Sequence, residues 1–189
     1  MTLPAPTADA IRAAVARYVA DPRNALADRT LTFLFRTYPQ NTDKTCVLLK
    51  VATLNALYST QIYDVITVAK HIVASSIDTR LGSGDLGVVD LIARVTFRAR
   101  IRTNYSFATK YCSWHRPDIF PICDDYVRKR LVAYKKAHRF ARFSADALTD
   151  YPEFVKVLKA FQEAFKLQDI PLRDVDKFLW LEGKAASGA

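Results

Sequence analysis

Apolar residues recur at helical spacing along almost the whole chain, and this pattern restricts the possible folds more than any other feature of the sequence. The chain has only five glycines and few segments that alternate β-branched and polar residues as strands do. We therefore expect an all-α domain of about eight to ten helices. The expected helices cover residues 8–20, 23–37, 43–57, 62–75, 85–96, 104–115, 124–137, 145–167 and 171–182.

Several residues are suited to begin these helices. Thr42 or Asp43 is an expected N-cap for the third helix, and Asp85 is an expected N-cap for the helix that follows a glycine-containing turn at 81–84. Pro171 is expected in the first turn of the last helix, where its missing N–H does no harm.

The length and composition indicate one helical domain over residues 1–189. The first residues lack the apolar stretch of a secretory signal, and no apolar run is long enough to span a bilayer, so we expect a cytoplasmic protein with no membrane partner. The three cysteines, Cys46, Cys112 and Cys123, have no CxxC spacing. We expect reduced thiols and neither a metal site nor an organic cofactor.

Positive charge is concentrated in one part of the chain. Residues 93–142 contain thirteen Lys or Arg and three Asp or Glu, a balance of +10, whereas the whole chain has a net charge of +9. The rest of the chain therefore sums to −1. A charge run is often only a solvated face, but a block that holds the entire excess favours binding to a phosphate backbone.

Two adjacent carboxylates interrupt this basic block. The apolar segment Ile119–Cys123 is followed by Asp124 and Asp125, at the start of an expected helix that continues with Arg128 and Lys129. Carboxylates in such a place usually cap the helix. Because so much positive charge surrounds them, these carboxylates also fit a site that binds a polyanion and uses one acidic side chain.

Two segments together resemble the helix-hairpin-helix DNA glycosylase superfamily, the endonuclease III, MutY and AlkA group. The first, Ala56–Asp64, is similar to the segment of that family that ends one helix and starts the next. The second, Phe120–Lys129, is similar to the segment that contains the catalytic Asp. The resemblance implies two helical lobes with the active-site cleft between them. It also implies that Asp124 is the catalytic carboxylate and that Asp125, its neighbour, is a second catalytic candidate, for which capping the helix is the favoured role. Gln61 would fill the gap left by an extruded base, or would serve as a polar C-cap between two helices.

The resemblance also implies how the bond is broken. A carboxylate beside the sugar would stabilise the positive charge that develops as the base leaves, and would orient or deprotonate the attacking water. Members with lyase activity have a Lys where this chain has Ser106, which implies a monofunctional enzyme. Lys110 lies one helical turn further on and is the alternative candidate for Schiff-base chemistry.

The chain departs from the family at the hairpin. The family hairpin contains glycines whose backbone amides approach a DNA phosphate, whereas the matching stretch here has none. Arg98, Arg100 and Arg102 lie there instead and are expected to bind phosphate by charge. The other candidate DNA or base contacts are aromatic or basic residues, for several of which core packing or solvation is the alternative: Tyr58, Ser106, Trp114, His115, Tyr126, Arg128, Lys129 and Arg130.

These observations predict a monomeric DNA N-glycosylase that binds duplex DNA without sequence preference, flips out a damaged or modified base and hydrolyses its N-glycosidic bond. Base-excision repair and defence against modified phage DNA are both compatible with it. Two alternatives remain: a nucleic-acid-binding module without catalysis on the same scaffold, and a helical protein–protein adaptor.

Overall fold

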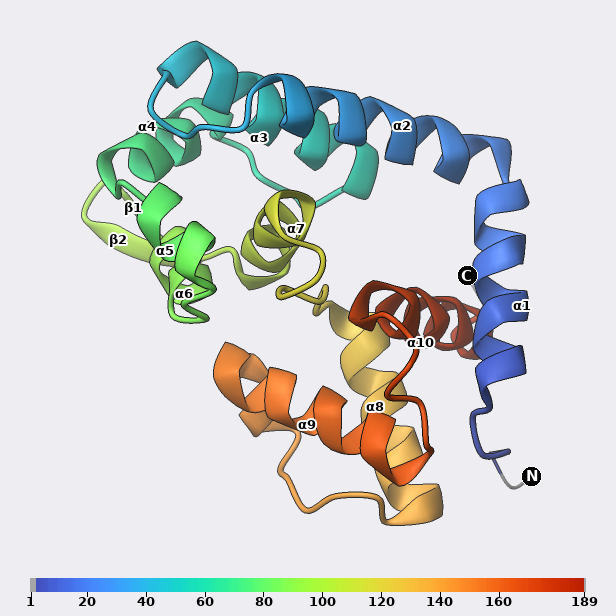
Figure 1. Cartoon of the computed structure of the whole chain (residues 1–189). Helices are drawn as coiled ribbons and strands as arrows, with labels where there is room; N and C mark the ends of the chain where they lie inside the picture. Colours follow the sequence, from blue (N-terminus) through green and yellow to red (C-terminus); the bar gives the residue numbers. More distant parts are fainter. Residues whose placement is uncertain (1–2, 189) are drawn as a thin grey trace. The chain divides into compact units, whose positions relative to one another are not determined.

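The structure, a computed structural model, describes residues 3–188 and is mainly helical in this range, which confirms the expected class. Ten α-helices, one 3₁₀ helix and one β-hairpin follow one another there (Figure 1). Their bounds are α1 Ala8–Ala20, α2 Pro22–Thr37, α3 Lys44–Tyr58, α4 Val65–Ala74, α5 Asp78–Ser83, α6 Val88–Ala93, β1 Arg94–Phe97, β2 Arg100–Thr103, α7 Tyr105–His115, α8 Asp125–His138, η1 Asp146–Thr149, α9 Tyr151–Ala164 and α10 Leu172–Ala186. None of these helices is both long and apolar enough to cross a membrane.

The described chain forms two compact units. Unit 2 is the continuous segment Leu26–Phe120, and unit 1 combines the residues up to Ala25 with those from Pro121 onward. The chain thus leaves unit 1 once and returns to it once. The two carboxylates of the basic block lie in unit 1, whereas Gln61, the three hairpin arginines and Lys110 lie in unit 2.

Unit 2 is built around α3, which packs against α4 and α7. Asp43 caps α3, because its side chain accepts a hydrogen bond from the backbone N–H of Cys46 at 2.8 Å. Val47, Val51 and Leu54 lie one turn apart and are fully buried, as helical spacing requires. This apolar stripe fixes which face of α3 turns inward.

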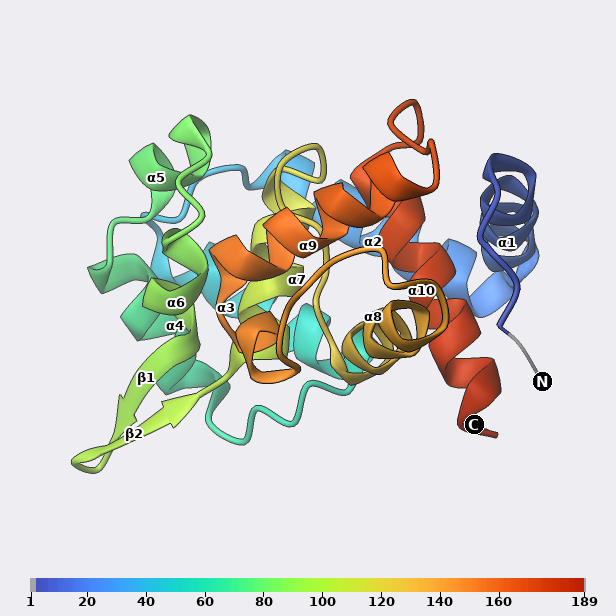
Figure 2. The same ribbon diagram turned by 90° about the horizontal axis from the view of Figure 1, so that it is seen from below.

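The β-hairpin is the main departure from the expected fold. The helix predicted to run from Asp85 to residue 96 is instead the short α6, which ends at Ala93, and β1 follows at once. Asp85 accepts from the N–H of Gly87 in the turn before α6 and does not cap the helix. Figure 2 shows the hairpin extending beyond α4 and α6. Alternating Val95, Thr96 and Phe97 are the residue types that favour a strand here over a helix.

The register of the hairpin fixes the direction of its arginines. Phe97 pairs with Arg100 and Val95 pairs with Arg102, so these four side chains share one face. The two-residue turn consists of Arg98 and Ala99, both with positive φ, at 44° and 66°. Positive φ at both central residues is the type I′ arrangement, which matches the twist of the strands and is normally built from Asn and Gly.

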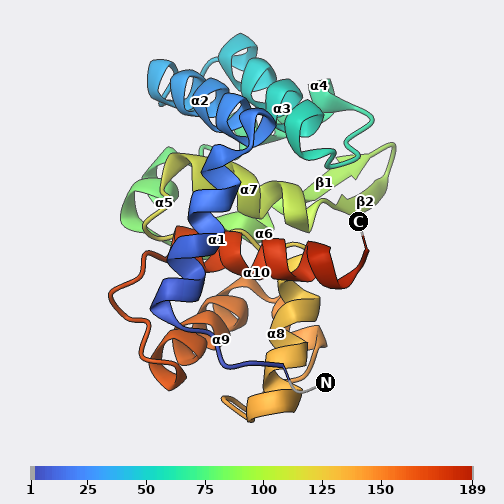
Figure 3. The ribbon, with the colours of Figure 1, turned by 90° about the vertical axis from the view of Figure 1, so that its right-hand side faces the viewer.

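Unit 1 is organised by α10, which packs against α8 and α1 (Figure 3). Gly183 permits the close contact with α8, since a Cβ atom there would lie 2.6 Å from the backbone oxygen of Tyr126. The predicted helix over 145–167 is divided into η1 and α9, because Asp150 caps a new helix by accepting from the N–H of Glu153 at 3.0 Å. Pro171 lies at the N-cap of α10, one residue before its first turn.

Candidate nucleic-acid interface and carboxylate site

The loop between α3 and α4 is held in an unusual conformation by one asparagine. Asn55 accepts from the N–H of Ile62 at 3.0 Å and from the hydroxyl of Thr60 at 2.8 Å, and its amide donates to the carbonyl of Ile62 at 3.0 Å. Ser59 and Gln61 both have positive φ, at 49° and 58°. Non-glycine residues rarely adopt this conformation unless surrounding contacts enforce it. Asn55 supplies those contacts. Gln61, in the middle of this loop, is exposed.

The hairpin and this loop meet directly within unit 2. Arg102 donates from Nη2 to the carbonyl oxygen of Gln61 at 3.2 Å, and its Cζ lies 5.1 Å from the centre of the Tyr63 ring. An open hollow on the surface of unit 2 is lined by Asp64, Thr67, Thr96, Phe97, Arg98 and Arg100. The predicted wedge residue and the three predicted phosphate-binding arginines therefore occupy one region of the surface of unit 2.

A third group of predicted residues gathers on α7. Lys110 donates to the Ser106 hydroxyl at 2.6 Å, which confirms that the two share a helix face, and its Nζ lies 5.6 Å from the centre of the Tyr58 ring. Lys110 is buried, with 4% of its surface exposed. Its amine is thus held by a hydroxyl and an aromatic face. Tyr58 was predicted independently of Ser106 and Lys110, and all three are neighbours in the structure.

Trp114 and His115 lie in an aromatic cluster of unit 2. The Trp114 and His115 rings lie 6.3 and 4.8 Å from that of Phe35, and His115 also packs 5.2 Å from Tyr111. Burial, and then the charge of Lys50, lowers the pKa of His115 to about 3, so the imidazole is neutral at pH 7. A neutral His115 has no charge with which to bind a phosphate. The structure therefore describes Trp114 and His115 as packing residues.

Beside this cluster lies a buried polar network. Lys50 is fully buried and donates to the carbonyl oxygens of Tyr38 and Gln40 and to Oδ1 of Asn41, at 2.7–3.1 Å. Asn41 in turn donates to Asp78 at 2.6 Å. Burial lowers the pKa of Lys50 to about 8, although the charge of Asp78 opposes the effect. The network ties the α2–α3 connection to the start of α5.

In unit 1, Asp124 caps α8, with Oδ1 accepting from the N–H of Val127 at 3.1 Å. This corrects the expectation that Asp125 would be the cap. Asp125 is exposed in the first turn and forms an ion pair with Arg128. Asp124 as a whole is half-buried.

The segment before Asp124 is fixed at two backbone positions. The Tyr151 hydroxyl donates to the carbonyl of Pro121 at 2.7 Å, and the N–H of Ile122 donates to Asp176 at 2.8 Å. Cys123 is also buried, with Sγ 3.7 Å from the carbonyl of Leu148. These contacts hold the extended segment Pro121–Cys123 in place, although it has no strand partner among the described residues. They thereby fix the backbone that leads into Asp124.

Asp176 is a buried acid next to the predicted catalytic carboxylate. It is 3% exposed, and Oδ1 lies 3.6 Å from Nη1 of Arg173. Burial raises the pKa of Asp176 to about 6; the charges of Arg173 and Lys177 and the bond from Ile122 oppose the rise, and the charge of Asp124 adds to it. Asp176 thus holds the backbone two residues before Asp124 through the N–H of Ile122.

The remaining predicted contacts of α8 divide into internal and exposed side chains. Tyr126 packs edge-on against Trp180, with 6.5 Å between ring centres. Arg130 forms an ion pair with Glu182 and stacks on Tyr134, so the phosphate contact considered for it is replaced by an internal one. Lys129 is exposed.

The sequence pattern alone did not indicate Asn55, Tyr63 or Asp176. Asp176 stands within the apolar stripe of α10, next to Val175 and one turn before Leu179, and a polar residue in such a stripe is a signal that could have been used. Tyr63 stands in a loop and Asn55 in the last turn of α3, and no periodic pattern marks either of them.

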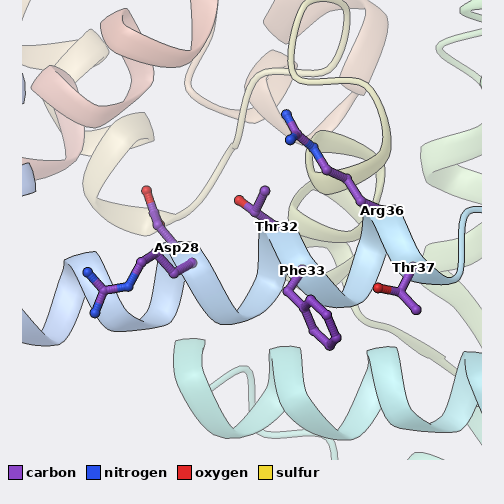
Figure 4. Close-up of a pocket in the computed structure, with 6 residues that line it drawn as sticks. Asp28, Thr32, Phe33, Arg36 and Thr37 are labelled. Atoms are coloured by element: carbon purple, nitrogen blue, oxygen red, sulfur yellow. The ribbon is translucent and has the colours of Figure 1, made fainter.

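A separate hollow in unit 2 contains none of the predicted site residues. It runs along α2 and is lined by Asp28, Arg29, Thr32, Phe33, Arg36 and Thr37. In Figure 4, Asp28, Thr32 and Arg36 point to one side of the helix and Phe33 points to the other. Phe33 is 69% exposed and so provides an accessible aromatic side chain away from the hairpin.

Comparison with known proteins places residues 10–119 within one family model, described as HI_0787_N, N-terminal domain. A Haemophilus influenzae protein described as uncharacterized is 41% identical over 131 residues, which make up 69% of this chain and 62% of the relative. The match therefore spans less than two thirds of that relative. No solved structure matches the chain. The family match includes the α3–α4 loop, the hairpin and α7, and it ends before Asp124.

Proposed function

We propose that this chain, which belongs to the HI_0787_N family, is a monofunctional DNA N-glycosylase. One observation carries the proposal: the loop braced by Asn55 presents Gln61 next to Arg102 of an arginine-bearing hairpin. A surface of this kind supplies both parts needed to open a duplex locally, namely charges that bind the backbone and a side chain that occupies the place of an extruded base.

The hairpin would bind DNA by charge and without sequence preference. Arg100 and Arg102 stand two residues apart on one strand face, about 7 Å from each other along the strand. Arg98 adds a third guanidinium at the tip and lines the hollow with Arg100. Side-chain charges would thus take the place of glycine amides, and affinity should fall steeply as salt rises.

Asp124 would supply the chemistry. When the base departs, the sugar becomes cationic, and a carboxylate beside it stabilises that state or accepts a proton from water. The fixed backbone of Pro121–Cys123 supports this role, because a catalytic group must be held close to its productive position. The nearby Asp176 adds a second negative charge.

The setting of Lys110 favours hydrolysis over a lyase reaction. A Schiff base requires an amine whose lone pair can reach the sugar. The Lys110 amine instead donates to Ser106, lies against the Tyr58 ring and is almost completely buried. Water is therefore the expected nucleophile.

Base release from a panel of lesion-bearing and phage-modified DNAs, detected by mass spectrometry, tests the proposal. Asp124→Asn should retain the cap, since Asn caps as well as Asp, and should bind DNA normally while losing about 100-fold or more in base release. Asp125→Asn, which alters an exposed carboxylate, is the matched control and should keep nearly full activity. Equal activity of Asp124→Asn and the wild type would contradict the role of Asp124. A strand break without alkali would point to Lys110.

A nucleic-acid-binding module without catalysis is the second candidate. The observation that favours it is the family match, which contains the whole hairpin and loop and ends before Asp124. In that case, no DNA on the panel should release a base, while binding should still weaken with salt. Replacing Arg98 and Arg100 with Ala should reduce the slope of log affinity against log salt by about 2. DNA affinity that is absent or independent of salt would favour a protein–protein adaptor.

A further inference from the structure

Tyr63 is the most exposed of the large hydrophobic side chains in the described chain, at 83%. It lies in the α3–α4 loop, one residue before the Asp64 cap of α4 and two after Gln61. An aromatic ring left in water gains nothing for the fold, because its apolar area stays unburied. Core packing therefore does not account for the position of this ring.

The ring is accompanied by a guanidinium that also bonds to the loop. Arg102 lies 5.1 Å from the ring centre and is also bonded to the carbonyl of Gln61 at 3.2 Å. That second bond restrains the arginine, and the arginine restrains the ring through a cation–π contact. The loop beneath both is braced by Asn55. Tyr63 is thus exposed and also held in place, which lowers the entropy lost on binding a flat ligand.

We propose that Tyr63, with Arg102, is a stacking site for an unpaired DNA base. A base within a duplex has both faces covered by its neighbours, so only an unpaired base can lie on this ring. Arg98 and Arg100 line the adjacent hollow and supply charge for the phosphates on either side of such a base. The site deepens the proposed function by naming its substrate: DNA with an unpaired or easily unstacked nucleotide next to the base that Gln61 displaces.

Binding of the full-length protein to a labelled short oligothymidylate and to a fully paired duplex tests this site. Tyr63→Ala should weaken oligothymidylate binding about tenfold, within the range that loss of one base–aromatic stack produces. It should change duplex binding less than about twofold. Tyr63→Phe and Tyr63→Trp should restore binding, and the salt dependence should not change, because no charge is altered.

Phe33→Ala is the control, because Phe33 is also an exposed aromatic residue of unit 2 and lies on α2. It should leave both affinities unchanged. Equal losses for oligothymidylate and duplex, or no loss for either, would overturn the stacking site. Tighter binding to an oligouridylate of the same length would overturn the assignment to DNA. If no DNA releases a base but Tyr63→Ala still acts selectively, the stacking site stands and the glycosylase proposal fails.

Discussion

Replacing Asp176 with asparagine should make the protein more stable at neutral pH. Burial is the main reason that the pKa of this acid rises from 3.8 to about 6. A tenfold change in proton affinity corresponds to about 1.4 kcal/mol, so holding Asp176 ionised in the folded protein costs about 3 kcal/mol. Asparagine can still accept the N–H of Ile122 and has no charge to bury.

The sign of the pH dependence follows from the direction of the shift. Between pH 3.8 and about 6 the folded state keeps the proton on Asp176 while the unfolded chain releases it, so the wild type loses stability as pH rises through this range. Above pH 6 Asp176 is ionised in both states, and the folded state carries the full cost of burying its charge. The gain from Asp176→Asn should therefore be largest above pH 6 and nearly absent close to pH 4.

Urea unfolding at several pH values measures this gain, and thermal unfolding should show a rise of about 5–10 °C in Tm at pH 7. Asp174→Asn is a suitable control, since Asp174 lies on the same helix and is only half-buried. The stability of the Asp174→Asn variant should stay close to that of the wild type at every pH. A variant at position 176 that is less stable at pH 7, or whose gain does not depend on pH, would refute the reasoning.

Two further predictions concern backbone strain and buried charge. Ala99→Gly should stabilise the protein by about 1 kcal/mol in urea unfolding, because φ is 66° there and glycine adopts it without strain; a loss of stability would contradict the type I′ turn. Lys50→Met should destabilise it by roughly 2 kcal/mol, because the buried Oδ1 of Asn41 loses one of its two donors and the carbonyls of Tyr38 and Gln40 lose the Lys50 amine. Lys44→Met, at the exposed start of α3, is its control and should be close to neutral.

Helical periodicity predicted most of the fold, because most helices here are amphipathic and bury one stripe. The helix over 104–115 illustrates this, since α7 begins and ends within one residue of the expected bounds. The same reasoning failed over 85–103, where tertiary contacts decide the outcome. Val95 is buried against α4 and α6, and a strand satisfies this burial while its neighbours stay exposed. No Asn-Gly turn marked the hairpin, since Arg98 and Ala99 form it.

Only those residues of the candidate site whose type itself indicates a role could be predicted from the sequence. Charge density identified the hairpin arginines, and a sequence resemblance identified Asp124 and Gln61. Neither could indicate Asn55, whose importance lies in bonds to backbone groups several residues away. Such positioning residues have no distinctive composition, so they become visible only when the loop conformation is known.

A buried acid that costs about 3 kcal/mol and has a neutral replacement of the same shape needs a reason to be charged. The position of Asp176 offers one, because it accepts the N–H of Ile122, only two residues before Asp124. If Asp124 stabilises a cationic sugar, a second carboxylate nearby makes the potential there more negative. Asp176→Asn should then release base about tenfold more slowly above pH 6 while binding DNA normally, and the rate of the wild type should fall toward that of the variant as pH drops below 6. If Asp176→Asn is more stable and releases base as fast as the wild type at every pH, Asp176 has no catalytic effect and its role is limited to the hydrogen bond with Ile122.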